Sequence, residues 1–155
     1  NVHPVAIAHE RDDRVKRLAG KIDRVLVDAP CSGLGTLRRN PDLKWRQSPQ
    51  SVEELTVKQT AILQSAARLL KPGGRLVYAT CSVLPQENEA IAQAFSEANK
   101  DFAPLEVRDI LSHLKVEGAP ALCAGPVTGG EFLRLWPHRH GTDGFFAAVW
   151  EKSAA

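Results

Sequence analysis

Two short apolar segments of the chain are each followed by a polar turn that contains a cysteine. Residues 23–27 are rich in β-branched side chains, and Asp28, Cys31 and two glycines come soon after them. Residues 75–79 form the second segment, which one threonine separates from Cys81. Short apolar runs bounded by turn residues are typical of buried strands. We therefore predict two strands that each carry a cysteine just beyond the carboxyl end, where ligands bind in open α/β sheets.

The clearest helical pattern covers residues 51–70, where apolar side chains recur on one face. Two starting points fit this helix: Ser51 with Glu54 matches a capping box, and Ser48 followed by Pro49 is an alternative. The strand–helix–strand order predicts a right-handed crossover between parallel strands. The inward face of the helix is expected to comprise Leu55, Ile62, Ala66, Leu69 and Leu70.

Weaker patterns complete the predicted fold. Residues 72–74, Pro-Gly-Gly, are expected to end the long helix and not to bind a cofactor, because they precede a strand instead of following one. We expect further strands at residues 2–8, 104–110, 131–137 and 144–150, helices at 11–18 and 85–99, and irregular segments at 32–50, 115–130 and 138–143. The last two strands would give the sheet an antiparallel edge. The helix at 85–99 is expected to bury Ile91, Ala94 and Phe95 and to carry Glu87 and Glu89 near its positively polarised start.

Composition limits the classes of function. A chain of 155 residues can form one domain with a core, and 43% hydrophobic and 25% charged residues are ordinary for a soluble globular protein. The net charge of +2 means that any nucleic-acid affinity must come from local patches. No apolar run is long enough to cross a membrane and no leader segment is visible, so we expect no membrane partner.

The cysteine and methionine content adds two expectations. The 3 cysteines lack paired spacing, which favours a reducing, cytoplasmic setting over a disulfide framework. The chain begins at Asn1 and contains no methionine, so we expect it to be a piece of a longer protein.

Cys31 and Cys81 carry the strongest chemical signal. If their strands are neighbours, about 4.8 Å apart, both thiols face one cleft. A thiolate is a good nucleophile when its surroundings lower its pKa. Two other interpretations stay open: both cysteines could be small buried hydrophobes, and Cys123 with His138 and His140 could bind zinc. No CxxC or HxxxH spacing supports zinc, so we expect no metal.

Several motifs together resemble the RNA (cytosine-5) methyltransferases, above all the Sun/Fmu-type bacterial enzymes that act on small-subunit ribosomal RNA. The resemblance runs from about residue 23 to residue 152. The motifs are Asp28-Ala29-Pro30-Cys31-Ser32-Gly33, Arg38-Arg39-Asn40-Pro41-Asp42, Lys44-Trp45, Tyr78-Ala79-Thr80-Cys81-Ser82, Glu87-Asn88-Glu89 and Asp143-Gly144-Phe145-Phe146.

The resemblance implies an α/β fold of the Rossmann-like methyltransferase type, with a mostly parallel sheet and an antiparallel edge strand. Residues 1–155 would be the C-terminal portion of one domain that uses S-adenosylmethionine. Cys81 would attack carbon 6 of a cytosine, so that carbon 5 becomes nucleophilic enough to take the methyl group. Cys31 would assist elimination and product release. Pro-Cys supplies the nucleophile in DNA cytosine methyltransferases, but the presence of Thr80-Cys81 favours the assignment of the RNA family.

The same resemblance implies where the cofactor and the RNA bind. Asp28 would contact the cytosine edge or the methionine end of the cofactor, beside Ala29 and Pro30, and Glu10 would lie near the adenine. Phosphates would bind Arg38, Arg39, Lys44 and Arg46, and Trp45 would stack or pack. Without the resemblance, a solvated surface loop explains these residues equally well. Arg134, His138 and His140 could extend the basic surface.

In this family a glycine-rich cofactor loop and an acidic residue lie upstream of the Asp-Ala-Pro-Cys motif, and neither is in this chain. We therefore expect the chain alone to bind the cofactor weakly or not at all and to be inactive. The strand at 23–27 would be an exposed edge able to pair with a second copy. Two alternative functions are a non-catalytic RNA-binding module and a thiol hydrolase in which His113, His138 or His140 serves Cys81.

Overall fold

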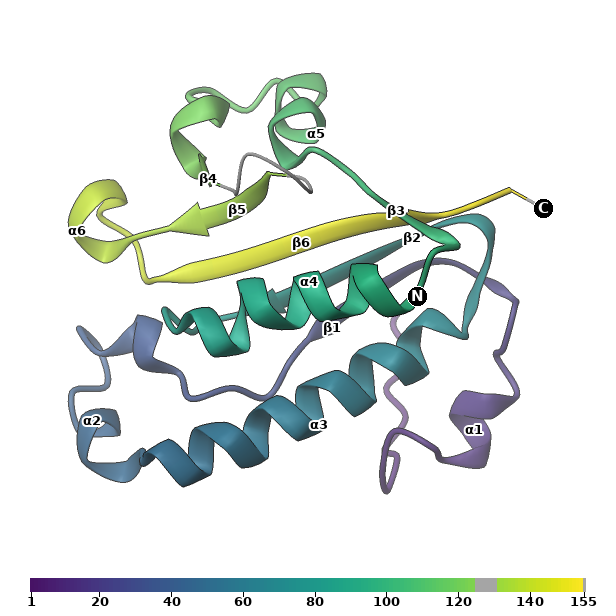
Figure 1. The fold of residues 1–155 in the computed structure, drawn as a ribbon, viewed down its shortest axis with the longest axis horizontal. Helices are drawn as coiled ribbons and strands as arrows, with labels where there is room; N and C mark the ends of the chain where they lie inside the picture. Colours follow the sequence, from purple (N-terminus) through teal and green to yellow (C-terminus); the bar gives the residue numbers. More distant parts are fainter. Residues whose placement is uncertain (125–130, 155) are drawn as a thin grey trace.

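The computed structural model describes residues 1–124 and 131–154, which form one mixed sheet with helices packed against it (Figure 1). The strand order is β1-β2-β6-β5-β4, and β3 also pairs with β6. The strands are β1 (Ile22–Asp28), β2 (Leu70–Thr80), β3 (Phe102–Pro104), β4 (Cys123–Ala124), β5 (Phe132–Leu135) and β6 (Phe145–Lys152).

The first two strands run parallel, as predicted, in a register that aligns Val27 with Tyr78 and Asp28 with Ala79. The α/β class is confirmed, but the expectation of a mostly parallel sheet is wrong for the described strands, in which β1–β2 is the one parallel pair. The cause is β6, which pairs antiparallel with β2, with β5 and with β3.

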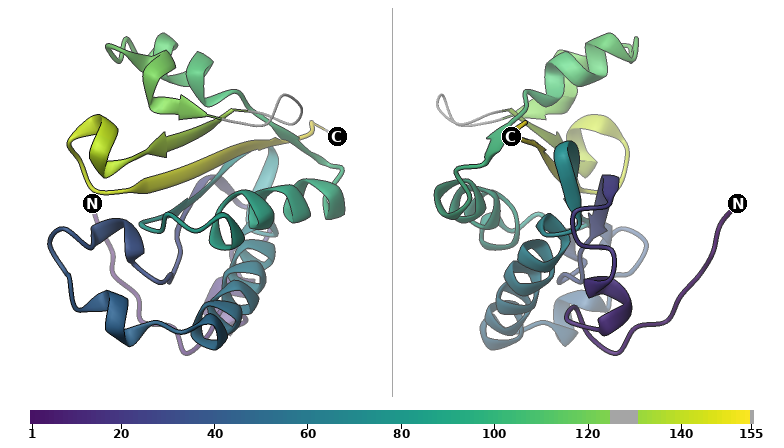
Figure 2. Two further views of the ribbon diagram at one scale, coloured as in Figure 1. Left: turned by 60° about the vertical axis from the view of Figure 1, so that its left-hand side comes forward. Right: turned by 90° about the vertical axis from the view of Figure 1, so that its right-hand side faces the viewer.

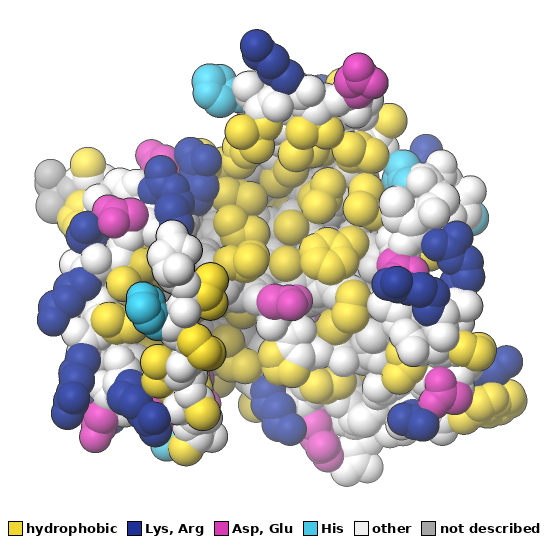
Figure 3. Space-filling view, turned by 180° about the vertical axis from the view of Figure 1, so that it is seen from behind, with side chains coloured by type: hydrophobic (Ala, Val, Ile, Leu, Met, Phe, Trp, Pro, Cys, Tyr) yellow, Lys and Arg dark blue, Asp and Glu magenta, His cyan; other side chains and the backbone are white. Residues whose placement is uncertain are grey.

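The two faces of the sheet differ in their cover. Helices α3 (Pro49–Ala67) and α4 (Glu89–Ala98) lie over one face (Figures 1 and 2), and Leu76, Tyr78 and Trp150 are fully buried beneath them. On the other face, hydrophobic side chains gather over the sheet and remain visible from outside (Figure 3). Leu26 belongs to this face and is 68% exposed. Since β1 ends the sheet, an apolar edge is accessible there.

The helix α3 starts and ends earlier than the range 51–70 that the sequence pattern predicted. Ser48 is the N-cap, because its hydroxyl accepts from the Ser51 amide at 3.1 Å and the Ser51 hydroxyl accepts from the Ser48 amide at 2.8 Å. The Ser48–Pro49 start is therefore confirmed, and the Ser51–Glu54 box is wrong. The helix buries Gln59, Leu63, Ala66 and Ala67, whereas Leu55 and Ile62 are partly exposed and residues 69 and 70 follow the helix.

Residues 72–74 do not end this helix, because it has already stopped at Ala67. They lie inside β2, where the register with β1 shifts between Ile22 and Arg24. Gly73 has a φ of +72°, a conformation that glycine adopts without strain. The Pro-Gly-Gly sequence thus forms an irregularity in the strand.

Other boundaries also differ from the predictions. Residues 2–8 form no strand, and Ala92 takes the buried place expected for Ala94. The strand predicted at residues 104–110 is wrong, because β3 ends at Pro104 and a helix begins at Val107. The predicted loop at 32–50 contains two helical turns. Part of the predicted irregular segment, residues 125–130, lies outside the described residues. The remaining helices are α1 (Asp13–Lys16), η1 (Leu34–Thr36), α2 (Leu43–Arg46), η2 (Pro85–Glu87), α5 (Val107–His113), η3 (Ala119–Leu122) and α6 (Pro137–His140).

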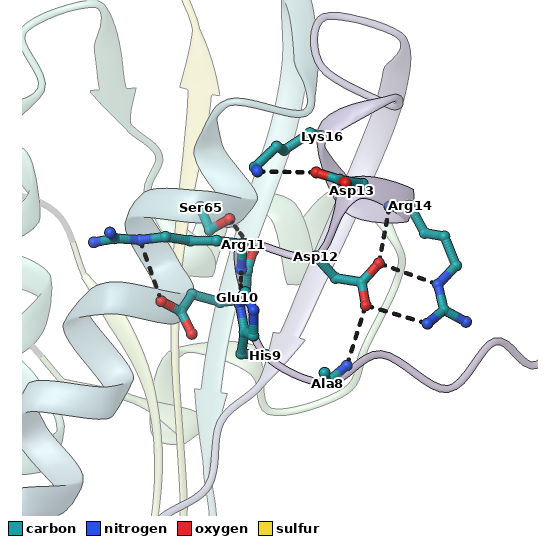
Figure 4. A network of polar contacts seen from close by, with 9 residues as sticks. All are labelled: Ala8, His9, Glu10, Arg11, Asp12, Asp13, Arg14, Lys16 and Ser65. Carbon is teal, nitrogen blue, oxygen red and sulfur yellow. Dashed lines mark hydrogen bonds and ion pairs between the residues drawn. The ribbon is translucent and has the colours of Figure 1, made fainter.

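Polar contacts attach the N-terminal segment to the helix α3 (Figure 4). Asp12 caps α1 by accepting from the Arg14 amide at 2.9 Å, and the Arg14 side chain holds the pKa of Asp12 below its usual range. The Ser65 hydroxyl of α3 donates to the Glu10 carbonyl at 2.6 Å. Glu10 is thereby placed beside the sheet edge that β1 forms.

Within the described ranges, none of the helices combines the length and apolar character needed to span a bilayer.

Candidate active site

Cys31 and Cys81 meet at the carboxyl ends of β1 and β2, as predicted. Their sulfur atoms are 3.5 Å apart, both cysteines are half-buried, and neither is in a disulfide. Parallel neighbouring strands end at the same edge of a sheet, so each turn delivers its cysteine to one place. Burial as two separate small hydrophobes is therefore excluded.

One hydrogen bond between the two thiols shifts their pKa values in opposite directions. Either sulfur can donate in the contact between the two thiols. With Cys31 as the donor, the hydrogen bond lowers the pKa of Cys81 to about 7, even though burial and the charges of Asp28 and Glu87 act in the opposite direction. The same bond, together with burial, raises the pKa of Cys31. Near neutral pH, a substantial fraction of Cys81 is therefore thiolate, whereas Cys31 stays protonated.

A close crossing of two glycines holds the Cys31 turn over Cys81. The Gly35 amide donates to the Cys81 carbonyl at 2.9 Å, and the Gly144 amide donates to the Gly35 carbonyl at 2.8 Å. A Cβ on Gly35 would lie 2.3 Å from the Gly144 carbonyl oxygen and 2.6 Å from that of Cys81. Only a residue without a side chain allows this approach.

Sequence reasoning missed a buried polar cluster beneath the thiols, made of Ser32, Gln59, Ser82, Glu87 and Asn88. Glu87 was expected near the positively polarised start of a helix, and the structure shows that it is fully buried and hydrogen-bonds to both cysteine turns. The Asn88 side chain bonds to Thr80 and to the Ser82 carbonyl. The signal that could have revealed the cluster is the repeated Cys-Ser pair, since both turns place a serine directly after the cysteine.

Three of the four residues predicted to bind the cofactor line one cavity. Glu10, Asp28 and Pro30 surround a space of about 430 Å³ whose floor includes Val25 and Ala66. Ala29 is buried and its side chain does not line this cavity. An apolar floor suits an adenine, and carboxylates suit ribose hydroxyls or a sulfonium, so the residues present fit S-adenosylmethionine.

The predicted RNA-binding residues lie together on the surface around α2. Trp45 is 80% exposed, and the Lys44 ammonium lies 4.8 Å from the centre of its ring. Arg38 donates to the Gly141 carbonyl. The guanidinium groups of Arg39 and Arg46 pair with Asp143 and Asp42, respectively.

A second cavity, of about 670 Å³, lies between this basic segment and the start of α3. Leu34, Lys44 and Leu84 are among its lining residues. Leu34 and Leu84 come three positions after Cys31 and Cys81, whereas Asp28 and Pro30, which line the first cavity, come before Cys31.

The structure does not support three weaker interpretations, namely Arg134 as part of the basic surface, His140 as a partner of Cys81, and a metal site. Arg134 does not extend the basic surface, because it is 5% exposed, donates to the Val83 carbonyl and stacks on Trp136. Burial lowers its pKa. His140 hydrogen-bonds to the backbone of Trp136 and Ala121 instead of Cys81. Across residues 1–124 and 131–154, no group of three or more histidine, cysteine or acidic side chains could hold a metal.

The sheet, its helices and the two neighbouring thiols define the class of protein. It has a Rossmann-like methyltransferase fold with two cysteines at the strand ends. The chain belongs to the family described as 16S rRNA methyltransferase RsmB/F, whose model matches residues 2–151. The predicted family is thereby confirmed.

Individual relatives agree. The chain is 43% identical over 134 residues to a probable ribosomal RNA small subunit methyltransferase B of Synechocystis. The aligned region covers 85% of this chain and 28% of that protein. It is 39% identical to the corresponding Bacillus subtilis protein, over 85% of this chain and 28% of the relative. Among solved structures, NSun6 from Pyrococcus horikoshii with SFG matches with a TM-score of 0.73 and 28% identity, over 100% of this chain and 35% of that one. The chain thus spans about a third or less of the length of these proteins.

Proposed function

We propose that the protein carrying this chain methylates carbon 5 of a cytosine in RNA, with ribosomal RNA as the expected substrate. The chain would be the C-terminal portion of one methyltransferase domain. The observation that carries the proposal is the 3.5 Å contact between a Cys81 of lowered pKa and a protonated Cys31. The relatives' names support RNA as the substrate. The mechanism needs free thiols, which fits a reducing, cytoplasmic setting.

The residues of this chain suit each step. The Cys81 thiolate forms a bond to carbon 6 of the cytosine, which makes carbon 5 nucleophilic. S-adenosylmethionine would be held by Glu10, Asp28 and Pro30 and would supply the methyl group. Carbon 5 must then lose its proton as the bond between sulfur and carbon 6 breaks. The structure solved with SFG, an analogue of S-adenosylmethionine, supports this cofactor.

Cys31 is suited to the last step because its pKa depends on Cys81. The hydrogen bond to the Cys81 thiolate is the main cause that raises the pKa of Cys31. Once the Cys81 sulfur is bonded to carbon, that cause is gone and the pKa of Cys31 falls. Cys31 can then release its own proton to water, and the resulting thiolate accepts the proton from carbon 5 as the bond between sulfur and carbon 6 breaks.

The two cavities offer the two substrates separate binding places. The cavity with Asp28 would take the cofactor, and the side with Lys44 and Trp45 would take the RNA. Lys44 and Arg46 would neutralise phosphates, and the exposed Trp45 ring would stack on a base. The target cytosine must leave its stack to reach the thiols.

Trapping tests this proposal in the intact protein. RNA that carries 5-fluorocytosine cannot lose fluorine from carbon 5, so incubation with S-adenosylmethionine is expected to leave a covalent protein–RNA adduct, seen as a band on a denaturing gel. Cys81→Ala should abolish the adduct, whereas Cys123→Ser, which changes a cysteine outside the site, should retain it. RNA binding without any adduct would contradict the proposal and favour a non-catalytic RNA-binding module.

We further propose that two copies of the isolated chain pair through β1. This strand ends the sheet, and Leu26 on it is 68% exposed. Sedimentation velocity at increasing concentration should show a dimer that Leu26→Lys weakens at least about tenfold, the effect of losing roughly 1.4 kcal/mol. Val57→Lys is the matched control, since Val57 is 66% exposed on α3. A monomer at every concentration would exclude this pairing.

A further inference from the structure

Glu87 is a buried acidic residue that the proposed chemistry does not use. Its side chain is fully buried, and both oxygens of its carboxylate accept hydrogen bonds. Oε1 accepts from the Ser32 amide at 2.8 Å and from the Gln59 side-chain amide at 3.0 Å. Oε2 accepts from the hydroxyls of Ser32 and Ser82, each at 2.5 Å. Four donors thus offset the cost of removing this charge from water.

The two serines connect Glu87 to the two cysteines in the same way. Ser32 follows Cys31 and Ser82 follows Cys81. Each hydroxyl also accepts from the backbone amide two residues further on, at 3.5 Å from Leu34 and at 3.1 Å from Leu84. A serine hydroxyl has one proton to donate, and in both turns that proton goes to Glu87.

Gln59 adds a third attachment on the Cys31 side. Its side-chain amide donates to the Pro30 carbonyl at 2.9 Å as well as to Glu87. The residues before and after Cys31 are therefore both held in relation to Glu87. From the other side, the Tyr78 hydroxyl of β2 donates to the Glu87 carbonyl at 2.7 Å, which fixes the backbone that carries the carboxylate.

We propose that Glu87 is a positioning residue whose carboxylate holds the two cysteine turns together and thereby maintains the contact between the sulfur atoms. Its catalytic importance rests on the proposed function, but its effect on the thiols does not. A carboxylate suits this position because it offers acceptors on both oxygens. A glutamine would present an amide donor to one pair of donors and lose those bonds.

The pKa of Cys81 separates three possible roles of Glu87, because each predicts a different sign. If Glu87 positions the thiols, Glu87→Gln weakens the hydrogen bond from Cys31. The pKa of Cys81 then rises, because this hydrogen bond is the largest influence on that pKa and the lost charge of Glu87 is the smallest. If Glu87 acts only through its charge, its removal lowers that pKa, since the charge raises it. If Glu87 only stabilises the fold, the pKa stays the same. Asp28 also faces Cys81 and is unchanged in all three cases.

The experiment measures the rate at which iodoacetamide alkylates Cys81 as a function of pH, in the folded chain with Cys123→Ser as background. We expect Glu87→Gln to move the midpoint of the profile upward by about one pH unit or more. Leu63→Ala removes a core side chain that is 1% exposed and should lower the melting temperature without moving the midpoint. In a Cys31→Ala background, Glu87→Gln should give no further upward shift, because the bond that it weakens is already absent.

A downward shift or an unchanged midpoint in Glu87→Gln would overturn the proposal. Both measurements need neither RNA nor cofactor, so failure of the proposed function would leave them unaffected. In the intact protein, the same variant should lower kcat for methyl transfer with little change in KM for RNA, because Glu87 is buried and does not face the substrate. A change confined to KM would also contradict a positioning role.

Discussion

Replacing Cys31 by alanine is expected to leave the intact protein covalently attached to unmodified RNA. In the proposed mechanism Cys81 can still attack carbon 6, but the thiol 3.5 Å away that is proposed to assist elimination is gone. Loss of a general acid or base typically slows a step by about 100-fold or more. The adduct should therefore accumulate on a denaturing gel with S-adenosylmethionine present. The Cys31→Ala, Cys81→Ala double variant should show no adduct.

The same variant changes the pH at which the adduct forms. Without the thiol that donates to it, Cys81 loses the main cause of its lowered pKa, and burial and Asp28 then raise that pKa. The thiolate fraction at neutral pH falls, so the adduct should form slowly near pH 7 and faster as the pH rises through the new pKa. Gel assays at about pH 7 and about pH 9 measure this. Normal turnover without an adduct at either pH would show that Cys31 has no part in release.

Gly35→Ala is expected to destabilise the fold by about 3 kcal/mol, the upper range for steric insertion into a packed site. The added Cβ would lie 2.3 Å and 2.6 Å from the carbonyl oxygens of Gly144 and Cys81, and backbone atoms cannot move aside independently. The loss should appear as a lower midpoint of urea unfolding with an unchanged slope.

Gly20→Ala provides the matched control. A Cβ on Gly20 meets nothing within 4 Å, so the cost comes only from its φ of +66° and should be about 1 kcal/mol. The difference between the two variants isolates the effect of the crossing at the active site. Equal unfolding midpoints would show that the crossing of Gly35 and Gly144 is not rigid.

Local pattern was sufficient for the elements that lead into the site. The strands that became β1 and β2 have short apolar runs bounded by turn residues, and their parallel pairing followed from the helix between them. The weaker segments were less predictable, because tertiary contacts decided them. Residues 2–8 found no partner strand within the described part of the chain, and β6 takes its direction from pairing with β2.

The position of Glu87 shows why part of the site could not be predicted. Acidic residues near the start of a helix are stabilised by the helix dipole, and this was the role expected for Glu87. Its partners Ser32 and Gln59 are 55 and 28 residues away in the chain, and no periodicity links such distant positions. The basic segment around Lys44 was predictable only in part. Its positive charges can be read from the sequence, but the pairing of Arg39 with Asp143 depends on the fold.

The sequence by itself determined that two cysteines follow two buried strands and that their motifs are those of one methyltransferase family. These features depend on neighbouring residues, whose pattern can be read directly. Only the tertiary structure decided that the sulfurs lie 3.5 Å apart and that Glu87 hydrogen-bonds to both cysteine turns. These features depend on contacts between distant segments, and such contacts exist only once the strands have paired and water has been excluded from between them.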